Sequence, residues 1–218
     1  MPKIDGVIKR RNPVFKIVME TDAVILGELF PLYAPQAVGN FISLANEGFY
    51  DGLSFHRCIQ GFIAQAGKAN PSQTLPYCIT GEFEFNSYKH GLLTHEYGSL
   101  CMARGGHYNS ASSEFFIVTT EDERELQCLN GAYAIFGKVY EGMRIIEAIS
   151  SVETDQNDKP IYLQNIRRIR VETFKQTYPF TKIPPPTSDV NIPVVKHRKK
   201  GNHKSSHENK KKEGISDG

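Results

Sequence analysis

The chain is divided into many short apolar runs, and this pattern constrains its fold more than any other feature. Gly, Asn and Ser separate the runs, which cover residues 14–20, 23–30, 53–59, 61–66, 98–103, 114–119, 133–140 and 166–174. Runs of this length, rich in Val, Ile and Phe and bounded by turn residues, are typical of strands. Short strands at this spacing indicate an antiparallel sandwich or barrel, and the pattern alone does not choose between the two.

Only two segments have a helical pattern. The first opens at Pro35 and repeats apolar residues at three- and four-residue spacing from Val38 to Ala45. Gly48 follows at the position where a helix C-cap belongs. Residues 142–150 form the second pattern. The sequence therefore predicts a mainly β protein with two short helices.

The character of the chain changes near residue 175. Residues 1–174 carry 16 Lys and Arg against 20 Asp and Glu, whereas residues 175–218 carry 10 against 4. The Pro-containing segment 175–195 is predicted to be a stiff linker. Residues 196–218 have no aromatic residue, so a disordered basic tail is predicted there. We therefore expect one domain over residues 1–174, followed by the linker and the tail.

Composition indicates the setting of the protein. No segment contains the ~20 consecutive apolar residues of a membrane span, and no apolar stretch of a secretory signal follows the basic N-terminus. The four cysteines are scattered without a C-x-x-C pair. This usage indicates neither a zinc site nor a disulfide framework. We expect a cytoplasmic protein, and nothing in the sequence requires more than a monomer.

Residues 55–67 contain the first candidate for chemistry. Arg57 lies there between two short apolar runs, and Gln65 follows within ten positions. A guanidinium with apolar neighbours is costly to remove from water unless it is paired or used. Taken alone, such an arginine is more often a structural ion-pair residue, so the role of Arg57 depends on its context.

That context consists of five ordered blocks on which the chain resembles the cyclophilins. The blocks are residues 55–57, 61–65, 99–104, 113–117 and 129–131 with 136–139. The resemblance covers roughly residues 7–174 and is strongest to the small cytoplasmic cyclophilins of bacteria. It implies a closed eight-stranded antiparallel barrel capped by two helices. It also implies peptidyl-prolyl cis-trans isomerase activity on X-Pro segments of unfolded or flexible proteins.

The resemblance also assigns roles to individual residues. Arg57 matches the family's catalytic arginine, which would donate a hydrogen bond to the prolyl nitrogen. Such a bond favours the twisted amide and lowers a barrier of ~18–20 kcal/mol that arises from amide resonance. No nucleophile, metal or cofactor is needed for this reaction. The proposed substrate-binding residues are Phe62, Ile63, Gln65, Ala103, Arg104, Glu114, Phe116, Cys128, Leu129 and Tyr133, of which Phe62, Ile63, Phe116 and Leu129 would form an apolar floor for the proline ring.

Three of these positions depart from the usual pattern of the family. Ile63 replaces a methionine, which is a mild change of shape. Cys128 replaces the tryptophan through which eukaryotic members contact cyclosporin, so weak binding of that drug is expected. Glu114 replaces a glutamine. A carboxylate there would pair with Arg57 and compete with the substrate, or it would orient the guanidinium at no cost. The first alternative predicts reduced activity, which Glu114→Gln would raise.

Simpler interpretations stand beside these. His56 is expected to be a buried structural histidine, because isomerisation transfers no proton, and Cys128 is expected to be an inert apolar residue rather than a modifiable thiol. The basic tail is a solvated segment, a salt-sensitive contact for RNA or acidic surfaces, or a weak metal site. The alternative to an isomerase is a proline-binding module with little catalysis, which its tail would localise. A nucleic-acid-binding protein would depend on the tail alone.

Overall fold

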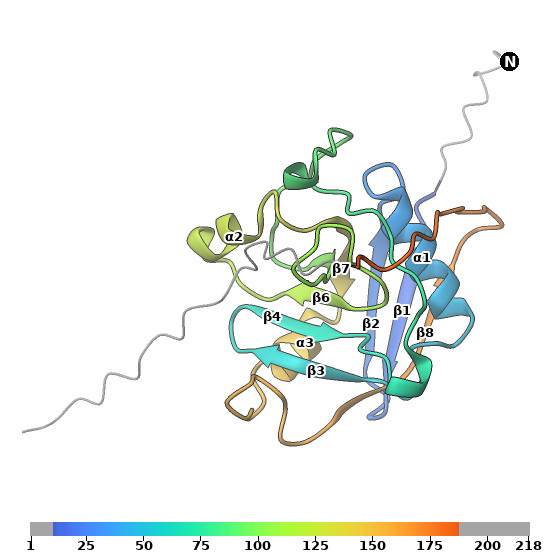
Figure 1. Ribbon diagram of the computed structural model, residues 1–218. Helices are drawn as coiled ribbons and strands as arrows, with labels where there is room; N and C mark the ends of the chain where they lie inside the picture. The colour runs from blue at the N-terminus through green and yellow to red at the C-terminus, as the bar shows by residue number, and fades with distance from the viewer. Residues whose placement is uncertain (1–10, 188–218) are drawn as a thin grey trace, which may run out of the picture.

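The structure is a computed structural model that describes residues 11–187. Eight antiparallel strands form a closed barrel in the order β1-β2-β7-β5-β6-β4-β3-β8 (Figure 1). The strands are β1 Val14–Met19, β2 Val24–Leu29, β3 Ser54–Ile59, β4 Ile63–Ala66, β5 Ser99–Met102, β6 Phe115–Val118, β7 Ile135–Glu141 and β8 Gln164–Glu172. The eight predicted strands are confirmed, and the fold is the barrel rather than the sandwich.

Closure of the barrel depends on the first and last strands. β1 pairs with β2 along one edge and with β8 along the other, with Ile17 opposite both Ile25 and Ile169. All three of these side chains are fully buried. The barrel therefore has no free edge within the described residues, and the first and last strands pack their buried side chains into the same apolar core.

Aromatic rings fill much of this core. Phe41 packs against Tyr50, Phe115 and Phe136, with ring centroids 5.2–5.4 Å apart. The Tyr50 hydroxyl donates to the Ser113 carbonyl at 3.0 Å. This buried bond fixes the segment that enters β6, the strand on which part of the candidate site is built.

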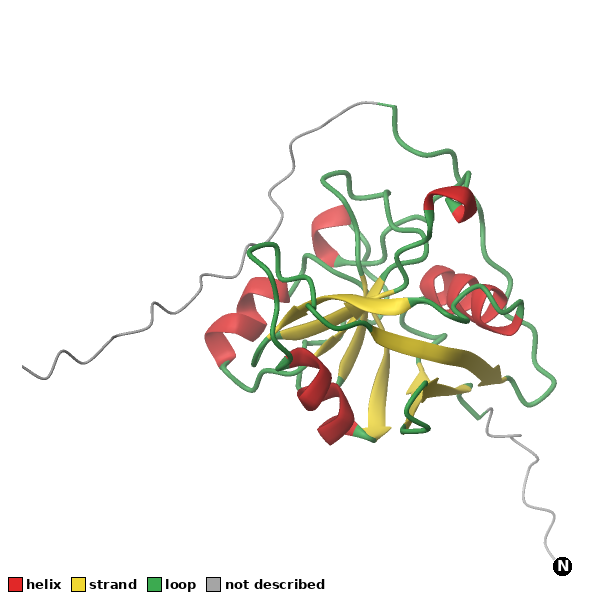
Figure 2. Ribbon diagram, turned by 90° about the horizontal axis from the view of Figure 1, so that it is seen from below, coloured by secondary structure: helices red, strands yellow, loops and turns green. Residues whose placement is uncertain are grey.

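Three α-helices lie at the periphery of the strands (Figure 2). The helices α1 (Pro35–Asn46) and α3 (Met143–Ser150) confirm the two predicted ones, whereas α2 (Glu123–Leu129) was not predicted. The Asp122 side chain caps α2 by accepting from the Arg124 N–H. This Asp cap and the acidic first turn were a readable signal. No helix in the range 11–187 is long and apolar enough to cross a membrane.

Helix α1 begins without a cap from its own segment. Its first-turn N–H groups, those of Gln36 and Ala37, donate instead to the carboxylate of Glu82 at 2.8 and 2.9 Å. Glu82 is a buried residue. Burial raises the pKa of its carboxyl to about 7, although the two backbone hydrogen bonds act in the opposite direction.

The predicted domain boundary at residue 174 is wrong, because the chain stays in contact with the domain beyond it. Tyr178 and Phe180 pack against the main core, and Ile183 forms a two-hydrogen-bond bridge with Cys78. Thr181 donates its N–H to the Gln36 side chain at 2.7 Å. The two aromatic residues give residues 175–187 enough apolar surface to dock along α1. The rest of the predicted linker, 188–195, and the tail, 196–218, lie outside the described residues.

The raised pKa of Glu82 predicts a pH-dependent stability. An acid whose folded pKa lies above its unfolded value stabilises the fold below that unfolded value, and this contribution is lost as pH rises through the folded pKa. Between pH 4.5 and 8 we expect wild type to lose up to about 3 kcal/mol relative to Glu82→Gln, which stays neutral. Urea unfolding at both pH values measures this difference.

Glu84→Gln, in the same loop but with an exposed side chain, is the matched control. Stability profiles of wild type and Glu82→Gln that run parallel from pH 4.5 to 8 would contradict the prediction.

Candidate active site

The register of four neighbouring strands places the functional side chains in one row. Arg57 on β3 lies opposite Gln65 on β4, Gln65 lies opposite Phe116 on β6, and Phe116 lies opposite Cys101 on β5. Residues directly opposite on antiparallel strands point to the same face of the sheet. The strands β3, β4 and β6 face the viewer side by side in Figure 1. The barrel thus places the predicted catalytic arginine on the same face as the predicted floor.

The four predicted floor residues form one apolar cluster. Phe62, Ile63, Phe116 and Leu129 belong to a cluster that is separate from the main core. They are nearly buried, and Tyr133, Ala103, Leu93 and Leu126 pack around them while staying partly exposed. The ring of Tyr133 meets that of Phe116 edge-on with centroids 5.3 Å apart. The structure therefore brings together residues from five separate segments of the chain.

Arg57 is half-buried beside this cluster and has a polar partner on each side. Its Nη1 donates to the Gln65 Oε1 at 3.5 Å, and its Nη2 lies 3.5 Å from the Asp158 Oδ2. These two contacts constrain the plane of the guanidinium. A guanidinium has five N–H donors in a fixed fork, so donors remain for a substrate.

Glu114 does not pair with Arg57, which corrects the competition that its sequence position suggested. Its Oε2 instead accepts from the Gln65 Nε2 at 2.8 Å and pairs with the His56 Nε2 at 3.1 Å. Burial acts to raise the pKa of Glu114, but the hydrogen bond and charge of His56, with Gln65 and Lys68, outweigh it, so the pKa is lowered.

The consequence is a fixed orientation for Gln65. Because its amide nitrogen donates to Glu114, its amide oxygen faces Arg57. Glu114 thus acts on Arg57 through Gln65, which is closer to the second alternative, in which the carboxylate orients the guanidinium. His56 is largely buried beside the site, as expected of a structural histidine. Its hydrogen-bond partner is Glu114, so His56 also helps to fix the carboxylate that orients Gln65.

A pocket of about 190 Å³ lies on one side of the cluster. Four of the predicted substrate-binding residues line it, namely Gln65, Ala103, Arg104 and Glu114. The Arg104 side chain is held by the protein itself, since it donates to the carbonyls of Ala132 and Gly105 at 3.0 Å each. Its guanidinium also lies 5.0–5.1 Å from the rings of Phe83, Tyr108 and Tyr133. Arg104 thus forms a wall of the pocket.

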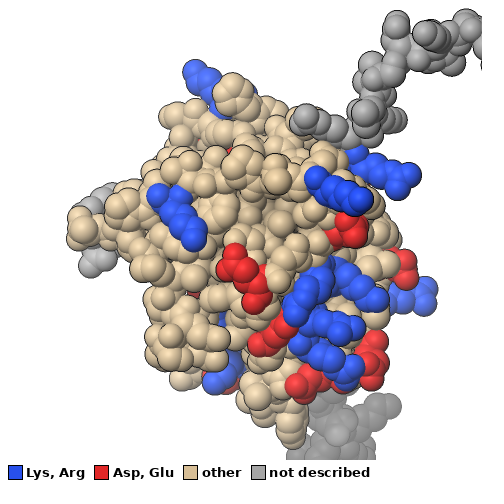
Figure 3. Space-filling model, turned by 90° about the vertical axis from the view of Figure 1, so that its right-hand side faces the viewer, with Lys and Arg blue, Asp and Glu red and all other residues tan. Residues whose placement is uncertain are grey.

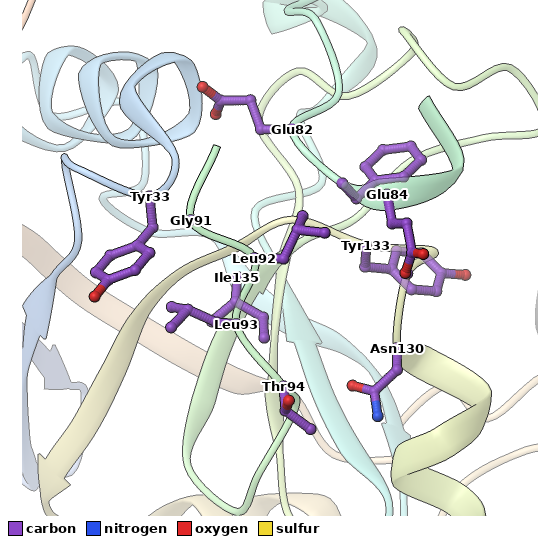
Figure 4. Close-up of a pocket in the computed structure, with 12 residues that line it drawn as sticks. Tyr33, Glu82, Glu84, Gly91, Leu92, Leu93, Thr94, Asn130, Tyr133 and Ile135 are labelled. Atoms are coloured by element: carbon purple, nitrogen blue, oxygen red, sulfur yellow. The ribbon is translucent and has the colours of Figure 1, made fainter. Parts of the chain in front are cut away.

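A second pocket of about 190 Å³ is lined by Tyr133 (Figure 4). Leu93, Ile135 and Asn130 are among its lining residues, and Tyr133 is the only predicted site residue there. The Asn130 side chain accepts from the N–H of His95 and contacts its Nδ1 at 2.9 Å. Burial lowers the pKa of His95 to about 4, against the effect of this hydrogen bond. The sequence pattern did not point to this pocket.

Cys128 differs from its predicted state. The residue is exposed on α2, whereas its neighbour Leu129 is buried in the cluster. The expectation that Cys128 packs as a small apolar residue is therefore wrong, and the inertness of its thiol stays a prediction. The physical reason is the unpredicted helix, because consecutive residues on a short helix face different directions.

Two further residues at the site were missed. Asp158 reaches Arg57 from the loop that precedes β8, and Leu126 of α2 packs against the apolar cluster. The Leu126-x-x-Leu129 spacing was a readable sign of a helix face. No sequence signal connects Asp158 with a residue about a hundred positions earlier.

The outer face of the barrel thus carries an arginine beside an apolar floor, and the thiol in the same row, that of Cys101, is fully buried, which raises its pKa. Such a face can hold an apolar group next to a hydrogen-bond donor. The comparisons with known proteins identify the family of the chain. Residues 15–171 match the model of the cyclophilin type peptidyl-prolyl cis-trans isomerases. The chain belongs to this family, and its function is that of a peptidyl-prolyl cis-trans isomerase.

Individual relatives agree with this assignment. The chain is 43% identical over 126 residues to peptidyl-prolyl cis-trans isomerase B of Bacillus subtilis, covering 57% of this chain and 81% of that protein. A cyclophilin type isomerase of Cryptosporidium parvum superimposes with a TM-score of 0.62 at 28% identity, covering 74% of this chain and 98% of that one. The same protein in the presence of the dipeptide Ala-Pro gives a TM-score of 0.60 at 28% identity, covering 73% and 98%.

The contacts of Glu114 change what its substitution should do. Gln at this position keeps an oxygen that accepts from Gln65, so we expect Glu114→Gln to alter kcat/KM on a prolyl peptide less than about twofold. Glu114→Leu removes the acceptor and frees the Gln65 amide, and we expect a loss of about three- to tenfold. A protease-free isomerisation assay measures both variants.

A clear rise of kcat/KM in Glu114→Gln would contradict this prediction and restore the competition hypothesis. Thermal unfolding of each variant shows whether a loss of activity reflects a loss of folded protein.

Proposed function

We propose that the chain isomerises X-Pro bonds at the face formed by β3, β4 and β6, with Arg57 as the catalytic residue. The observation that carries the proposal is the half-buried guanidinium next to the separate apolar cluster. The proline ring would rest on Phe116, Phe62 and Leu129. The remaining N–H donors of Arg57 would then face the prolyl nitrogen.

The chemistry follows from amide resonance. A hydrogen bond to the prolyl nitrogen favours its pyramidal form, in which conjugation with the carbonyl is lost. The bond forms fully only in the twisted transition state, so it lowers the barrier rather than only strengthening ground-state binding. Apolar neighbours strengthen the bond because they exclude water from it. Each ~1.4 kcal/mol gained in this way accelerates the reaction tenfold.

We further propose that the substrates are exposed X-Pro segments of unfolded or flexible proteins. The pocket beside Ala103 and Gln65 would hold the peptide backbone that precedes the proline. Support comes from the Cryptosporidium parvum relative, whose structure was obtained in the presence of Ala-Pro. A site that recognises the proline ring and the backbone accepts many sequences. A cytoplasmic monomer remains part of the proposal.

Removal of the guanidinium tests the catalytic assignment. We expect Arg57→Ala to lower kcat/KM on a prolyl peptide by about 100-fold, the usual effect of deleting one transition-state donor. The affinity for the peptide, measured by NMR titration, should change little, because the apolar floor remains. Arg168→Ala, which removes an exposed arginine of β8, is the matched control and should leave both quantities unchanged.

The same isomerisation assay distinguishes the isomerase from the alternative, a proline-binding module with little catalysis. Equal rates for wild type and Arg57→Ala, both at the uncatalysed level, would leave a proline-binding module without catalysis. A loss of peptide affinity that equals the loss of kcat/KM would show that Arg57 binds the substrate without accelerating the reaction.

We also propose that the basic segment 196–218 attaches the protein to RNA. Residues 11–187 carry 15 Lys and Arg against 19 Asp and Glu, so positive charge is concentrated outside the domain. On the face shown in Figure 3, basic side chains are interspersed with acidic ones. Arg167 and Arg170 of β8, for example, pair with Asp22 and Asp51. An unspecific contact with phosphates fits the tail better than it fits such a surface.

Salt dependence tests this attachment. Retention of the full chain on poly(U) should weaken ~300-fold or more between 50 and 200 mM salt if six or more phosphates are contacted. A variant in which Gln replaces every Lys and Arg of residues 196–218 should not be retained, while its isomerase activity stays unchanged. Retention of this variant would place the contact in the domain and contradict the proposal.

A further inference from the structure

The loop before β8 brings a carboxylate to the arginine of the active site. The Asp158 Oδ2 lies 3.5 Å from the Arg57 Nη2, and its side chain is only 18% exposed. The Gln65 Oε1 lies 3.5 Å from the other terminal nitrogen, Nη1. Arg57 is therefore held from two sides. One partner is on β4, and the other is on a loop about a hundred residues after Arg57 in the chain.

The loop is built to keep Asp158 in place. The Asp155 side chain accepts from the N–H groups of Asn157 and Lys159 at 2.8 and 3.0 Å. The Asp158 N–H donates to the Asp155 carbonyl at 3.1 Å, and the Asp158 carbonyl accepts from the N–H of Cys58 at 2.8 Å. The last bond ties the loop to β3 at the residue next to Arg57. The backbone of Asp158 thus moves with the strand that carries the guanidinium.

The backbone conformation of Asp158 has a cost that a smaller residue would avoid. Its φ is +64°, in the left-handed region where glycine is unstrained. A residue with a Cβ is disfavoured in this region, although Asp and Asn tolerate it better than other residues. A carboxylate is therefore present at a position where the turn alone would favour glycine.

We infer that Asp158 is a positioning residue for the isomerisation, which orients the Arg57 guanidinium toward the prolyl nitrogen. The inference rests on the proposed role of Arg57. A guanidinium that is free to rotate would present its donors to the substrate in many directions. Asp158 and Gln65 together restrict it to one plane, so the ordering cost is met before the substrate binds.

Asp158 has a second effect, which would lower the rate of isomerisation rather than raise it. Its negative charge also offsets the positive charge of Arg57, which would weaken the hydrogen bond to the substrate. The two effects are separable, because Asn keeps an oxygen acceptor and tolerates a positive φ but carries no charge, whereas Gly lacks the whole side chain. The hydrogen bonds of the Asp158 backbone remain possible in both variants.

The experiment compares Asp158→Gly and Asp158→Asn with a matched pair elsewhere in the barrel. Asp22 has a φ of +66° and pairs with Arg167, but it lies in the exposed turn between β1 and β2. We expect Asp158→Gly to lower kcat on a prolyl peptide about five- to tenfold. Its affinity for an Ala-Pro peptide should stay within a factor of two, and Asp158→Asn should retain at least half of the wild-type kcat. Asp22→Gly and Asp22→Asn should leave every value unchanged.

A second measurement observes the guanidinium directly. The side-chain Nε–H NMR signal of Arg57, assigned by its loss in Arg57→Lys, should shift and broaden in Asp158→Gly but not in Asp22→Gly. An unchanged signal would overturn the inference. It would also be overturned by an unchanged or higher kcat in Asp158→Gly, and by equal losses in the Gly and Asn variants. A wild type without isomerase activity would reject the proposed function, and the NMR signal would then decide the role of Asp158.

Discussion

The pairing of β4 with two neighbours is the constraint on which the site depends. β4 has only four residues, yet it aligns Gln65 with Arg57 on β3 and with Phe116 on β6. A shift of one residue in either register would turn these side chains to the opposite face. At the end of β4, Gly67 has a φ of +85°, and a Cβ there would lie 2.4 Å from the Ser113 carbonyl oxygen. The close approach of these two segments requires glycine and sets where β6 begins.

Polar groups with little access to water have partners in this protein that are distant in the sequence. Arg57 is held by Asp158, and the first turn of α1 is capped by Glu82, 46 residues after Gln36. Buried and half-buried polar groups need such partners because the protein interior solvates them poorly. At Arg57 the arrangement leaves N–H donors for a substrate. The same principle therefore explains both the cap of α1 and the position of Arg57 in the candidate active site.

Local sequence was sufficient for most of the fold. The short apolar runs predicted all eight strands, and Pro35 with the following apolar stripe predicted α1, because these signals depend on neighbouring residues only. Two local features were misjudged. Helix α2 is seven residues long, and the sequence analysis assigned no helix to it, although Asp122 caps its first turn. The three prolines after Lys182 suggested a linker, although Tyr178 and Phe180 could pack on the barrel.

At the candidate active site, the sequence by itself determined which residues belong together. The five ordered blocks selected Arg57, Gln65 and the apolar floor, and the structure brings them to one face. Only the tertiary structure decided how the charges pair. Glu114 was within reach of Arg57 on sequence grounds, but the fold directs it to His56 and Gln65, and it is Asp158 that meets the arginine. The physical reason is that ion pairs depend on ångström-scale positions of side chains from separate segments. Strand patterns and motif blocks indicate which face of the sheet a side chain lies on, but they do not indicate these positions.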